Sequence, residues 1–232
     1  MVTSKSTLRE ALTKLKALGD PENVAGMARF GVTAKKAYGV STPALRKLAR
    51  EIGRDQRLSL QLWATGIHDA RHLAALVGDP AQVTPAQMER WARDFDSWDL
   101  VDGPCCHLFV YTPHAWKKAL AWSRRKEEFV KRAGFSLMAY LAVHDKQAAD
   151  NKFLRLLPTI QRASLDERHF VKKAVNWALR QIGKRSLQLN KAAIATGHAI
   201  RALDTPAARW IAADALRELT SDTVRKRLEA RR

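Results

Sequence analysis

Cysteines and long apolar runs are scarce in this sequence of 232 residues. The two cysteines, Cys105 and Cys106, are adjacent, and an ordinary disulfide between neighbours is geometrically poor. The chain therefore has no disulfide framework, which is typical of a reducing compartment, and we expect a cytoplasmic location. No run of about 18 apolar residues occurs, so we expect no segment that spans a membrane.

Acidic residues are also few. Asp and Glu number 23 against 41 Lys and Arg, which gives a formal net charge of +18. The apolar share of 46% is nevertheless ample for a core. A chain this basic favours nucleic acid as its partner, with an acidic protein or a membrane surface as alternatives.

The familiar cofactor and metal motifs are missing. The sequence has no Walker loop and no glycine-rich dinucleotide fingerprint. His68 and His72 are four residues apart but lack the Glu of a metalloprotease motif. The carboxylates between Asp94 and Asp102 are only a weak signal for a metal-dependent nuclease. We therefore expect no cofactor and no metal.

Almost every segment has the apolar spacing of a helix, and no stretch alternates as a strand would. The spacing predicts helices over residues 7–18, 22–30, 43–52, 125–143 and 166–182. Polar residues, several of them followed by Pro, predict further helix starts. These predicted starts are Ser41, Asp55, Thr84, Thr112, Ser164, Thr205 and Ser221.

Helices joined by short polar turns along the whole chain predict an all-α fold. The predicted architecture is an α-solenoid of stacked HEAT-like helix pairs, each about 30 to 45 residues long, with a basic concave face. A compact all-helical domain is the alternative, because no consensus sequence recurs. No Gly/Ser/Pro-rich linker interrupts the pattern, so we predict a single domain over residues 1–232.

One stretch sets an apolar ring among carboxylates. Trp98 and Asp102 are four residues apart and would share a face of a continuing helix. The structural interpretation is a helix start, with Asp96 or Ser97 as N-cap and Asp99 favoured by the helix dipole. That interpretation does not account for Asp102. An aromatic platform beside a carboxylate suits the recognition and cleavage of a cationic group attached to a sugar.

On a helical wheel, residues 166–182 separate an apolar face from a cationic stripe. Trp177 falls in that stripe, among Lys173, Arg180 and Lys184. A helical Trp usually belongs to the core, but the wheel favours an exposed, functional side chain. Packing of Trp177 against a neighbouring repeat is the alternative.

Further cations occur outside this helix. Arg132 lies opposite the apolar side of residues 125–143, where its guanidinium fork could hold a phosphate or a carboxylate. A solvated arginine is the alternative. Lys35, Lys36 and Arg46 add charge near the N-terminus. A solenoid can gather such charges on one concave face for a duplex backbone, whereas scattering over all faces is the alternative.

Five stretches together resemble a known family. They are residues 38–46 (YGVSTPALR), 97–102 (SWDLVD), 131–133 (KRA), 171–180 (VKKAVNWALR) and 186–190 (SLQLN). On these residues the chain resembles the AlkD-like DNA alkylation repair glycosylases, which are built of HEAT-like repeats. The resemblance runs from about Leu8 to the C-terminus, and its motifs are specific in combination.

The resemblance implies a fold, a partner and a chemistry. Members hold duplex DNA on a concave basic face and hydrolyse the N-glycosidic bond of cationic N3- or N7-alkylated purines. It identifies Asp102 as the catalytic carboxylate, Trp98 and Trp177 as active-site tryptophans and Arg132 as the active-site arginine. The residues that we then expect to bind DNA are Lys35, Lys36, Tyr38, Arg46, Lys173, Arg180 and Lys184, of which Tyr38 is the loosest match.

We accordingly expect a monomeric, monofunctional glycosylase of the nucleoid that needs no cofactor. Gly103-Pro104 follows Asp102, and the residue before a Pro avoids the α region. We therefore expect either a kinked helix or a new helix that starts at Pro104. Two other functions remain open: a catalytically silent HEAT-like DNA-binding protein, and an adaptor for an acidic protein or RNA.

Overall fold

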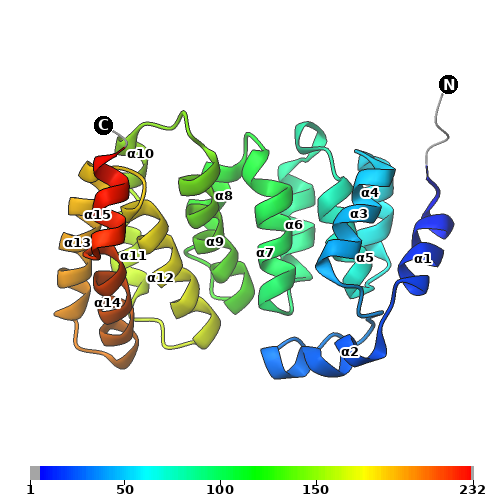
Figure 1. Cartoon of the computed structure of the whole chain (residues 1–232), viewed down its shortest axis with the longest axis horizontal. Coiled ribbons are helices and arrows are strands. Elements are labelled where there is room, and N and C mark those ends of the chain that lie inside the picture. The colour runs from blue at the N-terminus through cyan, green and yellow to red at the C-terminus, as the bar shows by residue number, and fades with distance from the viewer. Residues whose placement is uncertain (1–5, 231–232) are drawn as a thin grey trace. The chain divides into compact units, whose positions relative to one another are not determined.

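The structure, a computed structural model, describes residues 6–230, and all regular elements within them are helices (Figure 1). The predicted all-α class is therefore confirmed. The helices belong to two compact units, Met1–His114 and Ala115–Arg232. The single domain and the basic concave face stay predictions. Over the described residues, no helix is both long enough and apolar enough to cross a membrane.

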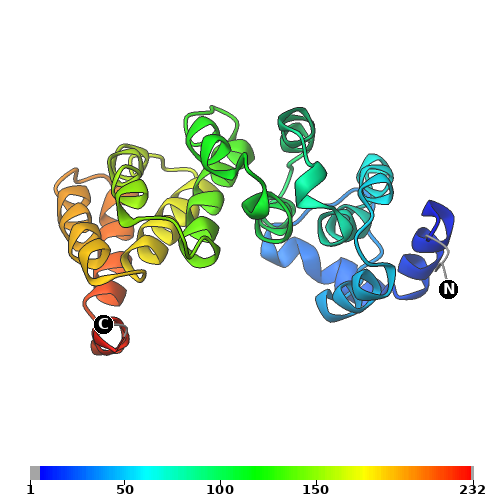
Figure 2. The ribbon, with the colours of Figure 1, turned by 90° about the horizontal axis from the view of Figure 1, so that it is seen from above.

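Unit 1 contains seven α-helices and three short 3₁₀ helices in the described residues. They are α1 (Leu8–Ala17), α2 (Pro21–Met27), η1 (Ala28–Phe30), α3 (Thr42–Ile52), α4 (Gln56–Ala64), α5 (His68–Val77), η2 (Pro80–Gln82), α6 (Pro85–Arg93), α7 (Trp98–His107) and η3 (Phe109–Tyr111). Helix α5 is central, because it packs against α1, α3, α4 and α7. Helix α2 runs across its neighbours rather than along them (Figures 1 and 2).

Two features order the interior of unit 1. Trp63 and Trp91 are buried and stack face to face, with ring centroids 3.9 Å apart and planes 4° from parallel. The buried carboxylate of Asp69 accepts hydrogen bonds from the backbone amides of Tyr38 (2.6 Å) and Val40 (2.7 Å). Asp69 therefore ties the loop that precedes α3 to α5.

Unit 2 contains eight α-helices in the described residues. They are α8 (Ala115–Trp122), α9 (Glu128–His144), α10 (Asp150–Leu154), α11 (Leu157–Ala163), α12 (His169–Gly183), α13 (Leu187–Arg201), α14 (Pro206–Leu219) and α15 (Asp222–Glu229). Helix α12 packs against α9, α13 and α14. Helices α8 and α9 approach closely at Gly134, where an added Cβ would lie 2.3 Å from the backbone nitrogen of Ser123.

Most of the predicted helix starts are confirmed. Five of the predicted residues are N-caps whose side chains accept from a backbone amide, namely Ser41, Asp55, Thr84, Thr205 and Ser221. The predicted helix starts at Thr112 and Ser164 are wrong, because α8 and α12 begin later, at Ala115 and His169. Both hydroxyls donate instead to a carbonyl three residues earlier, at 2.8 and 2.7 Å. That bond closes the preceding turn rather than opening the next helix.

Candidate functional site

Helix α7 carries the motif around Trp98 and begins directly at that residue, with Ser97 as its N-cap. The helix runs through Pro104 to His107, so the prediction of a separate helix starting at Pro104 is wrong. Trp98 and Asp102 are therefore one turn apart in one helix and lie on the same face. Both side chains are half-buried.

Trp98 is held by a residue that the sequence analysis missed. Its indole Nε1 donates a 2.8 Å hydrogen bond to the backbone carbonyl of Phe30, at the end of η1. The side chain of Phe30 is 71% exposed, which is unusual for a large apolar residue. The sequence signal was an aromatic residue just before Gly31, which ends the helix in the left-handed conformation (φ 74°).

Asp99 has closer partners than the helix dipole. Its Oδ2 lies 2.8 Å from Nε2 of His68 and 3.3 Å from Nε2 of His72. Burial acts to raise the pKa of Asp99, but the contacts with the two imidazoles prevail and hold that pKa far below its usual range. With Trp98 and Phe30, these residues line a cavity of about 420 Å³ in unit 1.

In unit 2, the wheel correctly predicts the apolar face of α12. The residues predicted on that face are all buried: Val171, Ala174, Val175, Ala178, Leu179 and Ile182. Trp177 is half-buried rather than exposed. Its ring meets Tyr140 of α9 edge to face, with centroids 4.8 Å apart. The alternative of packing against a neighbouring repeat therefore describes Trp177 better.

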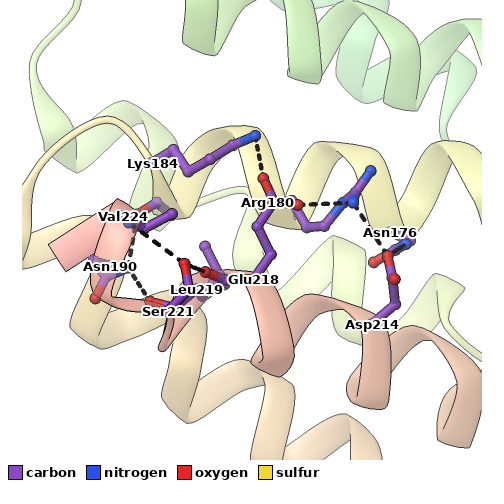
Figure 3. A network of polar contacts seen from close by, with 10 residues as sticks. Asn176, Arg180, Lys184, Asn190, Asp214, Glu218, Leu219, Ser221 and Val224 are labelled. Carbon is purple, nitrogen blue, oxygen red and sulfur yellow. Dashed lines mark hydrogen bonds and ion pairs between the residues drawn. The ribbon is translucent and has the colours of Figure 1, made fainter. Parts of the chain in front are cut away.

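Two predicted DNA-binding cations, Arg180 of α12 and Lys184 at its C-cap, are paired with acids of α14 (Figure 3). Arg180 Nη1 lies 2.7 Å from Glu218 and 3.2 Å from Asp214, and Lys184 Nζ lies 2.6 Å from Glu218. Asn176 joins the network by donating to Asp214 at 2.7 Å. The charges of Arg180 and Lys184 are thus largely neutralised within the protein.

The remaining predicted cations are placed differently. Lys35, Lys36, Arg46 and Lys173 are all exposed. Within residues 6–230, the structure gives none of these four side chains an ion-pair partner. Tyr38 is half-buried in the loop before α3, and its backbone is fixed by hydrogen bonds.

Arg132 is only 6% exposed, so the solvated arginine considered above is wrong. Its Nη1 donates to the carbonyl of Phe170 at 2.9 Å, which links α9 to α12. The preceding Lys131 pairs with Asp166 at 2.8 Å, and Arg168 contacts the same carboxylate at 2.7 Å. The predicted contact of Arg132 with DNA stays a prediction.

Comparison with known proteins adds to this geometry. No curated protein matches the chain. A solved structure is similar over 84% of this chain and 83% of its own, with a TM-score of 0.76 and 22% sequence identity. That structure is described as a new family of proteins related to the HEAT-like repeat DNA glycosylases with affinity for branched DNA structures. At this identity the likeness shows the fold, which confirms the predicted HEAT-like helical class.

A family model supplies the stronger relationship. The model described as DNA alkylation repair enzyme matches residues 11–222, which is nearly the whole chain. The match includes both α7, with Trp98 and Asp102, and α12, with Trp177. The chain therefore belongs to the family of DNA alkylation repair enzymes.

Proposed function

We propose that the protein is a monofunctional DNA glycosylase. It hydrolyses the N-glycosidic bond of cationic N3- or N7-alkylated purines in duplex DNA. The observation that carries this proposal is the unbroken helix α7, which holds Trp98 and Asp102 on one face. It does so in a chain that belongs to the DNA alkylation repair enzymes.

The proposed reaction needs few catalytic groups from the protein. A cationic alkylpurine is already a good leaving group, so no general acid is needed. Positive charge develops on the deoxyribose as the bond breaks, and the carboxylate of Asp102 stabilises it and orients the attacking water. The ring face of Trp98 adds a favourable interaction with the same charge. Phe30, whose carbonyl accepts from the Trp98 indole, offers an exposed ring in the wall of the same cavity.

Unit 2 contributes the remaining proposed residues. Trp177 would contact the sugar and backbone with the part of its ring that Tyr140 leaves uncovered. Arg132 would hold a phosphate from its buried position between α9 and α12. The exposed cations Lys35, Lys36, Arg46 and Lys173, together with Tyr38, would bind phosphates that flank the damaged base. Arg180 and Lys184 would contribute less, because they already face acids.

The test is the release of methylated purines from alkylated duplex DNA by the purified protein. We expect Asp102→Asn to lower the rate by on the order of 10² or more, as for other preorganised electrostatic groups. Duplex binding should be retained, because the carboxylate does not contact phosphate. The matched control is Asp96→Asn, an exposed carboxylate just before α7, which should release purines normally. Equal release by the wild type and Asp102→Asn would refute the proposal.

A second function is favoured by the similar solved structure. Because its family is described as having affinity for branched DNA, a non-catalytic protein that binds branched DNA is the alternative. Tighter binding to a four-way junction than to a linear duplex, with no purine release above background, would support it. A preference for alkylated over undamaged duplex would support the glycosylase instead.

A further inference from the structure

A cluster of three potential metal ligands lies in unit 1, outside the pair formed by Trp98 and Asp102. His68 and His72 are on successive turns of α5, and Asp99 is in the first turn of α7. One ligand atom from each residue lies within 4.8 Å of the other two. The three residues also line the cavity of about 420 Å³, so a small ion can reach them.

The contact between His68 and Asp99 is close, but its alignment is poor for a hydrogen bond. The imidazole Nε2 is 2.8 Å from the carboxylate oxygen, yet it makes no well-aligned hydrogen bond within the described residues. The His68 side chain is almost fully buried, since the residue is only 8% exposed. A buried imidazole nitrogen that lies so close to a carboxylate oxygen without good hydrogen-bond alignment needs an explanation. An ion coordinated by both atoms provides one.

The donor set fits a particular class of ion. Two imidazole nitrogens and one carboxylate oxygen suit zinc and similar divalent transition metals. Ligands of tetrahedral zinc lie about 3.3 Å apart, because Zn–N and Zn–O bonds are about 2.0–2.1 Å long. The observed separation of 3.3 Å between Asp99 and His72 matches that value, and the separation of 2.8 Å between Asp99 and His68 is shorter than it. Three protein ligands also leave a fourth position for a small ligand.

The cavity wall contains a second carboxylate, that of Asp69, whose partners differ from those of Asp99. Asp69 uses both oxygens to accept backbone amides, so it is already satisfied. Asp99 accepts a backbone amide, that of Leu100 at 2.9 Å, with Oδ1 alone. Its Oδ2 faces the two histidines. Gly103 leaves room for the ring of His72, because an added Cβ would lie 2.9 Å from its Nδ1.

We propose that His68, His72 and Asp99 form a binding site for one divalent transition-metal ion of the zinc class. The ion ties α5 to the first turn of α7, immediately beside Trp98, and presents its fourth position to the cavity. The sequence analysis predicted no metal, because the third ligand lies on a separate helix. This site does not depend on the glycosylase activity.

The experiment uses the full chain, freed of metal by a chelator and then titrated with Zn²⁺ by calorimetry. We expect one ion per chain and a higher Tm with Zn²⁺ present. Co²⁺ should give the visible absorption of a four-coordinate site with nitrogen and oxygen ligands. This spectrum is measured on the wild type, so it does not depend on the folding of a variant.

Variants then identify the ligands. His72→Ala and Asp99→Asn should each weaken Zn²⁺ binding by about 100-fold or more, and Gly103→Ala, which removes no ligand, by about 10-fold through displacement of His72. The matched controls are His107→Gln, in the wall of the same cavity, and His198→Gln, an exposed histidine of α13. Both controls should bind Zn²⁺ as the wild type does.

Two outcomes would overturn the proposal. One is the absence of saturable binding of Zn²⁺ or Co²⁺ to the folded wild type. The other is binding that Asp99→Asn and His72→Ala leave unchanged while the variants keep the wild-type helical content. Loss of binding only in the His198→Gln control would place the ion on the surface and would overturn it equally.

Discussion

The predicted DNA-binding cations differ between the two units, except that Lys173 of unit 2 is exposed as those of unit 1 are. In unit 1, Lys35, Lys36 and Arg46 are exposed, and the described residues give them no ion-pair partner. In unit 2, Arg180 and Lys184 contact carboxylates of α14 at 2.6–3.2 Å. A solvated cation can neutralise a phosphate directly, whereas a paired one must first give up its acid. Position on a helical wheel does not distinguish these cases.

The proposed site tryptophans of the two units are also held by different kinds of contact. Trp98 in unit 1 is anchored by a polar bond from its indole nitrogen to the carbonyl of Phe30. Trp177 in unit 2 is anchored by an apolar contact with the ring of Tyr140. Unit 1 therefore presents Trp98 in the wall of a cavity, and unit 2 holds Trp177 within helix packing.

The largest expected effect tests this difference through the folding free energy. Arg132→Ala should destabilise the protein by about 2–3 kcal/mol, because it leaves the Phe170 carbonyl without its donor and opens a gap between α9 and α12. Arg46→Ala, its exposed counterpart in unit 1, should change stability by about 0.5 kcal/mol or less. Chemical denaturation of both variants measures the contrast, and equal losses would break it.

Trp177→Ala should have an intermediate effect on stability. The edge-to-face contact with Tyr140 accounts for about 0.5–1.5 kcal/mol, to which loss of half-buried area adds a similar amount. We expect this loss in a thermal melt, together with slower purine release. Trp177→Phe is the control, because it keeps a ring against Tyr140 and should restore most of the stability. A loss below the error of the melt would mean that the ring is idle in the fold.

Salt dependence of duplex binding should separate the two kinds of cation. Lys36→Ala should reduce the slope of log K against log salt by about one unit if the lysine contacts a phosphate. Lys184→Ala should reduce it by clearly less, because Glu218 already neutralises that charge. Glu218→Gln is the sharper test, because it removes the one carboxylate charge that contacts both Lys184 and Arg180, while Asp214 still contacts Arg180, and it should steepen the slope. Equal slopes for Lys36→Ala and Lys184→Ala would remove the distinction.

The smallest expected effect is a pH dependence in unit 2. Burial acts to raise the pKa of Asp166, but the contacts with Arg168 and Lys131 outweigh it and hold the pKa well below its usual range. Because the folded pKa is depressed, its stabilisation is present above the unfolded value of about 3.9 and is lost as the pH falls below it. Denaturation midpoints at several acidic pH values should therefore fall less steeply in Asp166→Asn than in the wild type.

The sequence allowed the helices to be predicted because their apolar faces recur locally. Residues 171–182 of α12 show this, since the periodicity correctly identified the buried positions. The helix began three residues later than predicted, at His169, because Ser164 closes the turn before it. Boundaries depend on which way one hydroxyl bonds, and periodicity carries no information about that.

Contacts between helices were not predictable in the same way. The pairing of Asp99 with His68 and His72 joins α7 to α5, and that of Arg180 with Glu218 joins α12 to α14. Neither pair shares a local pattern in the sequence, because each depends on which helices become neighbours. Arg132 shows the consequence. The helical wheel includes only α9 and therefore placed Arg132 in solvent, whereas in the structure α12 covers it.

The stack of Trp63 and Trp91 gives unit 1 an optical signature of its own. Two indoles held 3.9 Å apart and 4° from parallel couple their electronic transitions and absorb less light than the same rings apart. Separation of the rings should therefore raise the ultraviolet absorbance, and the rise would come from Met1–His114 alone. The amide band, by contrast, reports every helix of the chain. Comparing the two signals during one melt would reveal whether the units unfold together or in sequence.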